Sequence, residues 1–339
     1  MSTVPPPLGR AARLYGQRDL RLSSDPVPTP GPGEVLLEVT AVGLCGSDRH
    51  WYLDGSLGGT TIEQPLVLGH EIAAVIADGP EAGTRVAVEP AIPCGSCPTC
   101  RSGRDELCAT ARFAGHAGTD GGLRTRMAWP RHLVRAVPDA IGDPEASVLE
   151  ALGVALNAID LGAVDAASRV AVLGCGPIGL LVILALRAAG VDDVLADEPL
   201  PHRAAAATAA GARLISDAAT AEALGQVDVV IECAGDDGAI SRATQLARPG
   251  GRIVLVGIPD GDRTTFTASE ARRKGLTFVM CRRMRVGDLD RAIASVADGK
   301  VDLAPLITHR YPLDEVAEAF EALVDRRGVK VVVLPQPPA

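Results

Sequence analysis

The stretch that decides the fold is Val170-Ala171-Val172-Leu173-Gly174-Cys175-Gly176-Pro177-Ile178-Gly179. It joins four apolar residues, typical of a buried strand, to a G-x-G-x-x-G turn, and a run with helical spacing follows. Glycines let the backbone turn tightly and approach a pyrophosphate, and the free N–H groups at the start of a helix favour an anion. The pattern therefore predicts a dinucleotide-binding βαβ unit whose cofactor-binding residues are Gly174, Gly176, Pro177, Ile178 and Gly179.

Two acids stand where a dinucleotide site needs one. Asp197 and Glu198 end the next predicted strand, about 20 residues after the glycines, where a carboxylate binds the ribose diol of the cofactor. Spacing alone leaves both acids open. A carboxylate here favours NAD over NADP, because it repels a 2′-phosphate and no basic residue follows at once. Arg203, in the following predicted helix, is a further candidate for binding the cofactor.

The rest of the chain shows two different sequence patterns, one before residue 140 and one after residue 144. After residue 144, strands alternate with helices at the spacing of a doubly wound parallel sheet, with strands at 170–173, 194–197, 227–231, 252–256 and 276–280. Before residue 140, short apolar runs between Gly/Pro turns, at 34–42, 72–77, 85–88 and 131–137, predict an irregular, barrel-like β domain with few helices. We therefore expect a β domain over 1–149, a Rossmann dinucleotide-binding domain over 150–285, and a segment over 286–339 that returns to the first domain.

Composition excludes several functional classes. The 339 residues carry 33 Lys and Arg against 42 Asp and Glu, a net charge of −9, which argues against nucleic acid or an anionic membrane as the main partner. No uninterrupted apolar run of about 20 residues is present, and the N-terminus lacks a signal-like stretch. Eight cysteines without an export signal favour a reducing, cytoplasmic location. The Pro-rich ends, 5–7 and 335–338, are expected to fray.

Four cysteines form the most specific local pattern. Cys94, Cys97, Cys100 and Cys108 lie within fifteen residues, a spacing that can close a tetrahedral all-thiolate site on one loop. Zinc suits soft thiolate ligands, and a closed site has a structural role. Disulfides are the alternative, and a reducing compartment disfavours them.

Taken together, several motifs resemble the zinc-dependent medium-chain dehydrogenases, above all the sorbitol (polyol) dehydrogenase-like branch. The carriers are Gly43-Leu44-Cys45-Gly46-Ser47-Asp48-x-His50, Leu68-Gly69-His70-Glu71, the four-cysteine loop, the glycine turn and Thr308-His309-Arg310. The resemblance covers essentially the whole chain. It implies a GroES-like β-barrel as the catalytic domain, and two zinc ions per chain, one catalytic and one structural.

The same resemblance assigns roles to individual residues. It implies a catalytic zinc held by Cys45 and His70, with Glu71 and Glu150 bound directly or through water. Such a site, with a place open for alcohol, suits catalysis. Ser47 and His50 match the positions that pass the alcohol proton to solvent, whereas Asp48 is expected to make turn hydrogen bonds. Three assignments are less specific: Trp51, Phe113 and His116 are candidates for the substrate pocket or for loop packing.

The predicted function is that of an NAD-dependent zinc oxidoreductase acting on a secondary alcohol of a polyol, cyclitol or related polar substrate. Ala151 and Asn157 replace a Pro and a His common in relatives, and Trp51 replaces a Tyr of sorbitol enzymes, so the substrate stays open. Alternatives are an L-threonine 3-dehydrogenase-like, an aldose 1-dehydrogenase-like or a butanediol dehydrogenase-like enzyme, and a nucleotide-binding sensor or structural protein. We expect a homodimer or homotetramer.

Overall fold

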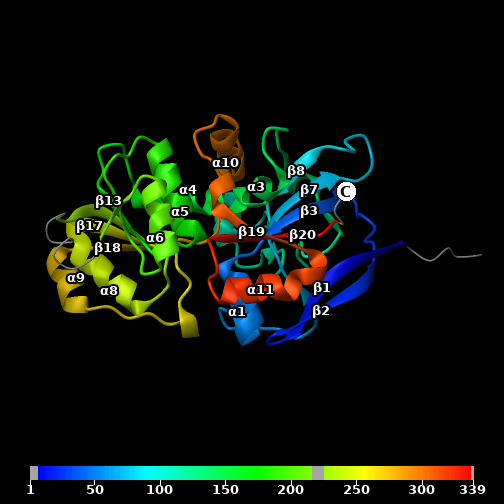
Figure 1. Ribbon diagram of the computed structural model, residues 1–339, viewed down its shortest axis with the longest axis horizontal. Helices are drawn as coiled ribbons and strands as arrows, with labels where there is room; N and C mark the ends of the chain where they lie inside the picture. Colours follow the sequence, from blue (N-terminus) through cyan, green and yellow to red (C-terminus); the bar gives the residue numbers. More distant parts are fainter. Residues whose placement is uncertain (1–6, 216–224, 337–339) are drawn as a thin grey trace, which may run out of the picture. The chain divides into compact units, whose positions relative to one another are not determined.

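The predicted βαβ unit lies at the centre of a six-stranded sheet (Figure 1). The computed structural model describes residues 7–215 and 225–336, so most of the Pro-rich ends lies outside the described residues. In the order β15-β14-β13-β16-β17-β18, every neighbouring pair of strands is parallel. The strands are β13 (Val170–Leu173), β14 (Val194–Asp197), β15 (Arg213–Leu214), β16 (Val227–Glu232), β17 (Ala247–Leu255) and β18 (Thr277–Met280).

The described helices that precede, separate and follow these strands are α4 (Leu149–Gly162), α5 (Pro177–Ala188), α6 (Pro201–Ala209), α8 (Asp237–Leu246), α9 (Ala268–Lys274) and α10 (Asp288–Ala297). Helix α5 contacts β13, β14 and α6, whereas α8 contacts β13, β16, β17 and α9. All four residues of β13 are buried, as expected for a parallel strand covered on both faces. The doubly wound parallel sheet is therefore confirmed.

The chain divides into two compact units. The first contains residues 1–150 and 303–339, and the second contains residues 151–302. The chain thus returns to the first unit at Leu303, later than the expected residue 286. Arg291 explains the difference, because its guanidinium in α10 bonds Asp160 of α4 at 2.9 Å and so ties α10 to the second unit.

The first unit is built around a seven-stranded sheet. Its central order is β12-β8-β7-β3-β20-β19, and β11 also pairs with β3. Figure 1 shows the red C-terminal strand β20 beside the blue strand β3, with which it pairs antiparallel. The strands of this unit are β1 (Leu8–Gly16), β2 (Asp19–Pro26), β3 (Glu34–Gly43), β4 (Ser56–Leu57), β5 (Thr60–Thr61), β6 (Leu66–Val67), β7 (Glu71–Ile76), β8 (Arg85–Val88), β9 (Ala91–Ile92), β10 (Arg112–Phe113), β11 (Arg126–Pro130), β12 (Val134–Ala136), β19 (Ile307–Pro312) and β20 (Lys330–Leu334).

One local prediction for the first unit was partly wrong, and two elements there were not predicted. The helices there are α1 (Gly46–Asp54), α2 (Pro98–Arg101), α3 (Asp143–Ser147) and α11 (Val316–Val324). Helix α1 was not predicted, because its sequence is polar and weakly amphipathic; burial of Trp51 and Tyr52 in the core stabilises it. The run 131–137 begins as a 3-10 turn, and only β12 is strand. The hairpin of β1 and β2 was also missed.

Among residues 7–215 and 225–336, no helix combines the length and apolar composition that a membrane span requires.

Candidate active site

Three candidate metal ligands come together where strand β3 ends and strand β7 begins. Strands β3 and β7 pair antiparallel with Gly43 opposite Glu71, so the loop after β3 and the loop before β7 meet. Cys45 lies in the first loop, and His70 and Glu71 lie at the end of the second. The sulfur of Cys45, a ring nitrogen of His70 and a carboxylate oxygen of Glu71 all lie within 4.8 Å of one another. This donor set fits zinc.

Asp48 holds the two ligand loops together. Its side chain is fully buried in α1. Oδ2 accepts a hydrogen bond from the Cys45 N–H at 2.9 Å, and Oδ1 accepts one from the Gly69 N–H at 3.2 Å. Oδ1 also lies 3.8 Å from Nδ1 of His70. We expected only turn hydrogen bonds, and the sequence signal that we missed is the acid three residues after the helix cap.

Acidic and thiol groups surround the His70 ring. Burial alone would lower the pKa of His70, but the charges of Asp48, Cys45 and Glu150 outweigh burial and raise that pKa to about 10. Glu150, buried at the start of α4, therefore faces the same site, although it is not among the three residues grouped within 4.8 Å. Carboxylate and thiol groups gathered around one imidazole are donors that a divalent cation can use.

The residues expected to move the proton and line the pocket have the following contacts. His50 in α1 is 8% exposed, and its Nδ1 lies 3.2 Å from Oδ2 of Asp54. The ring of Phe113 lies 5.2 Å from that of His70, centroid to centroid. Trp51 packs edge-on against His116 at 5.1 Å and is only 1% exposed, so it belongs to the core and has little surface left for a substrate.

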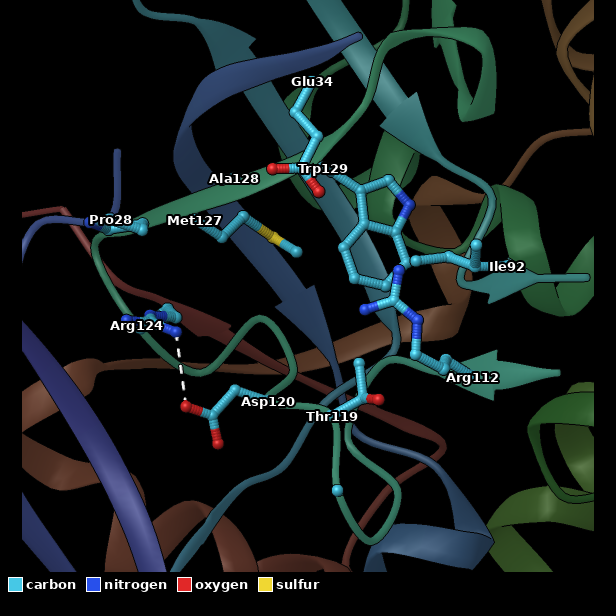
Figure 2. A pocket seen from close by; sticks show the side chains of 11 residues that line it. Pro28, Glu34, Ile92, Arg112, Thr119, Asp120, Arg124, Met127, Ala128 and Trp129 are labelled. Atoms are coloured by element: carbon cyan, nitrogen blue, oxygen red, sulfur yellow. Dashed lines mark hydrogen bonds and ion pairs between the residues drawn. The ribbon is translucent and has the colours of Figure 1, made fainter. Parts of the chain in front are cut away.

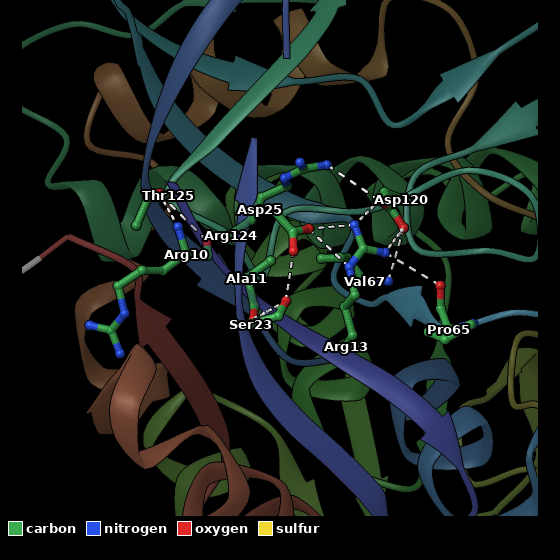
Figure 3. Close-up of polar contacts among 10 residues, drawn as sticks. All are labelled: Arg10, Ala11, Arg13, Ser23, Asp25, Pro65, Val67, Asp120, Arg124 and Thr125. Carbon is green, nitrogen blue, oxygen red and sulfur yellow. Dashed lines mark hydrogen bonds and ion pairs between the residues drawn. The ribbon is translucent and has the colours of Figure 1, made fainter. Parts of the chain in front are cut away.

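The loop that carries Phe113 and His116 is held by a polar network (Figure 3). Asp120 lies between two arginines: Arg13 donates to it at 2.9 Å and Arg124 at 3.4 Å. Asp120 also accepts a hydrogen bond from the Val67 N–H at 3.1 Å. Backbone hydrogen bonds then continue to the residue before His70, with the Gly122 N–H donating to the Gly69 carbonyl at 2.8 Å. The network fixes this loop beside the ligand loops.

A cavity of about 240 Å³ lies beside the same loop (Figure 2). Arg112, Thr119 and Asp120 of the loop line it, together with Met127 and Trp129 of β11. Its lining includes none of the residues expected to bind zinc, move the proton or contact the substrate, so this cavity is separate from the ligand group.

The four-cysteine loop has the geometry of a closed site. The ligand atoms of Cys94, Cys97, Cys100 and Cys108 all lie within 4.8 Å of one another. The sulfur of Cys100 lies 3.4 Å from that of Cys97 and 3.9 Å from that of Cys94. A zinc tetrahedron with bonds of about 2.3 Å has edges of about 3.8 Å, whereas a disulfide would bring sulfurs to about 2.05 Å. The loop therefore fits zinc. Backbone N–H groups of Ser96 and Cys97 lower the pKa of Cys94 to about 5, which favours the thiolate.

Contacts at the glycine turn in the second unit distinguish Glu198 from Asp197. Gly174 has φ +82°, and a Cβ there would meet the Ala234 backbone, so this position requires glycine. Oε2 of Glu198 accepts a hydrogen bond from the Cys175 N–H at 2.7 Å, whereas Asp197 forms an ion pair with Arg242. Arg203 lies close to Gly176. Glu198 is thus the acid that lies at the turn.

Comparison with known proteins identifies the family. The family model for the alcohol dehydrogenase GroES-like domain matches residues 31–139, and the model for zinc-binding dehydrogenases matches residues 177–298. The sorbitol dehydrogenase of Bacillus subtilis (strain 168) is 31% identical over 350 residues, which cover 98% of this chain and 99% of that enzyme.

Two solved structures are similar over the whole chain. An alcohol dehydrogenase from Escherichia coli CFT073, complexed with NADH, is 27% identical with a TM-score of 0.88, covering 97% of this chain and 99% of that one. A zinc-binding dehydrogenase from Sinorhizobium meliloti 1021, bound to NADP, is 29% identical with a TM-score of 0.88, covering 97% and 100%. These matches confirm the predicted fold class and enzyme class, an oxidoreductase of alcohols that uses zinc and a nicotinamide cofactor. The chain belongs to the zinc-binding alcohol dehydrogenase family, in its sorbitol dehydrogenase-like branch.

Proposed function

We propose that this protein oxidises a secondary alcohol of a polyol, cyclitol or related polar substrate, with NAD as the hydride acceptor. The observation that carries the proposal is the buried group of Cys45, His70 and Glu71, with the carboxylate of Glu150 facing it. Cys45 and His70 would hold zinc, with Glu71 and Glu150 bound directly or through water. Zinc held there would polarise the hydroxyl and stabilise the alkoxide.

The chain itself provides a route for the alcohol proton. Ser47 and His50 lie three residues apart in α1, so their side chains share one face of the helix. The Ser47 hydroxyl, two residues after Cys45, would contact the substrate hydroxyl, and His50 would accept its proton. His50 then reaches Asp54, whose side chain is 55% exposed, which supports delivery of the proton to solvent.

The cofactor assignment rests on the second unit. Gly174, Gly176, Pro177, Ile178 and Gly179 would hold the pyrophosphate of the dinucleotide, and Arg203 would contribute at the same turn. Glu198 would bind the ribose diol through its carboxylate, which favours NAD because a 2′-phosphate would be repelled.

The choice of substrate follows from the ligand chemistry. Carboxylates at Glu71 and Glu150 make the metal surroundings harder and richer in hydrogen-bond acceptors than thiolates would. Such a site suits a substrate with a second hydroxyl beside the reacting one. Phe113 and His116 would complete the pocket, and Trp51 would support His116 from the core.

The proposal extends to assembly and location. Strand β18 is an edge strand; its Met280 is exposed, and so is Phe266, which stacks on Phe278 of this strand. An open apolar edge of this kind supports a homodimer or homotetramer, and light scattering gives the mass that tests it. The cysteines with metal-binding geometry support a reducing cytoplasm.

One experiment tests the function. Zinc content and steady-state kinetics with NAD are measured on the same preparation, with sorbitol, xylitol and an inositol as substrates. L-threonine, glucose and 2,3-butanediol are the rivals, and ethanol and butanol the simple controls. We expect about two zinc ions per chain and a kcat/KM for the best polyol on the order of a hundredfold above that for ethanol, because buried polar groups left unpaired discriminate strongly. Faster turnover of ethanol or butanol than of every polyol would contradict the substrate assignment. Absence of NADH formation on every alcohol would instead favour a nucleotide-binding sensor.

A further inference from the structure

A buried amide in helix α4 bonds to the backbone just beyond strand β18. Asn157 is only 2% exposed. Its Nδ2 donates a hydrogen bond to the Arg283 carbonyl at 2.8 Å and lies 3.7 Å from the sulfur of Cys281. Among the described residues, nothing donates a hydrogen bond to its Oδ1. Because a buried amide is unfavourable compared with an apolar side chain unless it is hydrogen-bonded, the bond to Arg283 is a specific feature of this helix.

One face of α4 holds the segment that follows β18. Gly153, Asn157 and Asp160 are spaced by four and three residues, so they lie on the same face of the helix. A Cβ at Gly153 would lie 2.8 Å from the sulfur of Met284, so the glycine lets this side chain approach the helix. The carboxylate of Asp160 forms an ion pair with Arg285. Three contacts along one helix face therefore fix three successive residues of the segment.

The sheet does not hold this segment. Strand β18 lies at the edge of the sheet and pairs only with β17, and the Cys281 N–H still donates to the Leu255 carbonyl at 2.8 Å. Two residues later, Arg283 has φ +57°, in the left-handed region that residues other than glycine rarely adopt. Such a backbone conformation persists only where its surroundings fix it. The hydrogen bond from Asn157 to the carbonyl of this same residue provides that constraint.

The segment lies at the edge of the sheet where a dinucleotide would bind. In open parallel sheets, ligands bind outside the carboxyl ends of the strands. The glycine turn follows β13 and Glu198 follows β14, whereas β16, β17 and β18 continue on the opposite side of β13. A dinucleotide with its adenosine ribose at Glu198 and its pyrophosphate at the glycine turn would therefore direct its nicotinamide half toward the ends of β16, β17 and β18.

We propose that Asn157 is a positioning residue that holds the segment after β18, residues 281–285, in the conformation that receives the nicotinamide half of the cofactor. The inference rests on the dinucleotide site of the proposed function. It concerns only one half of the dinucleotide, so a ligand that lacks this half measures the rest of the site separately.

The test compares NADH with ADP-ribose, which has the adenosine, the pyrophosphate and the second ribose but no nicotinamide. Asn157→Leu keeps the approximate size of the side chain and removes its N–H groups. In calorimetric titrations of the full-length, zinc-loaded protein, we expect the Kd for NADH to rise about tenfold, as for the loss of one hydrogen bond. The Kd for ADP-ribose should stay within about twofold. The KM for NAD should rise together with the Kd for NADH.

Two further variants separate positioning from packing. Asn157→His should bring the Kd for NADH back to within about threefold of the native value, because an imidazole Nδ1–H can donate to the same carbonyl. Thr244→Val is the matched control: it removes another buried hydrogen bond of the second unit, from the Thr244 hydroxyl to the Ser241 carbonyl in α8. It should lower stability without changing the ratio of the two dissociation constants.

Equal weakening of NADH and ADP-ribose in a folded Asn157→Leu protein would overturn the proposal, and so would unchanged binding of both. Should Asn157→Leu fail to fold, Asn157→Ala decides with the same two ligands and the same ratio. A native protein that binds neither NADH nor ADP-ribose would contradict the dinucleotide site itself, an outcome distinct from these.

Discussion

At the scale of single residues, hydrogen bonds distinguish two acids that are equivalent in the sequence. Asp197 and Glu198 are adjacent acids at the end of β14, and spacing allows either to bind a ribose. The Glu198 carboxylate accepts hydrogen bonds from the N–H groups of Cys175 and Leu200, which hold it at the glycine turn. Asp197 is instead neutralised by Arg242. The preference for NAD should therefore depend on Glu198.

Glu198→Ser combined with Pro199→Arg should shift the ratio of kcat/KM for NAD and NADP toward NADP by on the order of a hundredfold. The ribose loses a carboxylate partner, while the 2′-phosphate loses a repulsive charge and gains a cation. Steady-state kinetics with both cofactors measure the ratio. Asp197→Asn is the matched control and should leave the ratio within about threefold. A ratio that moves only with Asp197→Asn would assign the ribose to Asp197.

At the scale of elements, helix α1 depends on tertiary contacts. Its Tyr52 hydroxyl donates a hydrogen bond to Oε1 of Glu321 in α11 at 2.8 Å, and the Tyr52 ring packs against Phe320. Burial, then the hydrogen bond to Glu321, raises the pKa of Tyr52 to about 12. These contacts connect the helix that carries Ser47 and His50 to the C-terminal part of the first unit.

The raised pKa of Tyr52 predicts a pH-dependent contribution to stability. The neutral phenol is favoured in the folded state, so the contribution is full below pH 10 and is lost as pH rises from 10 to about 12. Tyr52→Phe should lower the free energy of unfolding by about 1 kcal/mol at pH 7. The difference between the native protein and this variant should shrink above pH 10. Urea unfolding at pH 7 to 11 measures it. Tyr15→Phe, at an exposed tyrosine, is the control, and a Tyr52→Phe difference that stays constant with pH would contradict the assignment.

At the scale of the whole molecule, the chemistry is divided between the two units. Both candidate zinc sites lie in the first unit, whereas the glycine turn and Glu198 lie in the second. Each unit has its own hydrophobic core. Damage to a metal site should therefore leave dinucleotide binding in place, and the two metal sites should differ in what their loss does.

Cys45→Ala should remove one of two zinc ions and nearly all turnover, yet leave NADH binding within about threefold, because the dinucleotide-binding residues are untouched. Cys100→Ala should instead lower the unfolding temperature by several degrees, because it opens a closed structural site. Metal analysis, NADH fluorescence titration and thermal unfolding of both variants are the measurements. Full zinc content and activity in Cys45→Ala would show that the catalytic assignment is wrong.

The sequence by itself determined the features whose physical signal is local. The parallel sheet follows from buried apolar runs such as 170–173, the dinucleotide turn from its glycines, and the four-cysteine loop from ligands that lie close together in the chain. Short-range spacing is enough in each case, because the groups that interact are separated by few residues.

Only the tertiary structure decided what depends on distant segments. Helix α1 has little helical signal of its own and is stabilised by the core into which Trp51 and Tyr52 pack. The ion pair of Asp197 with Arg242 distinguishes Asp197 from Glu198, and the hydrogen bond from the Gly69 N–H defines the role of Asp48. Neither partner is close in the sequence. Lys330 lies 259 residues from Glu71 in the sequence, and no periodicity or motif connects them. The two residues lie close together because β20 and β7 flank β3 in one sheet. Both side chains are buried, and a buried charge is unfavourable unless an opposite charge compensates it, so they pair.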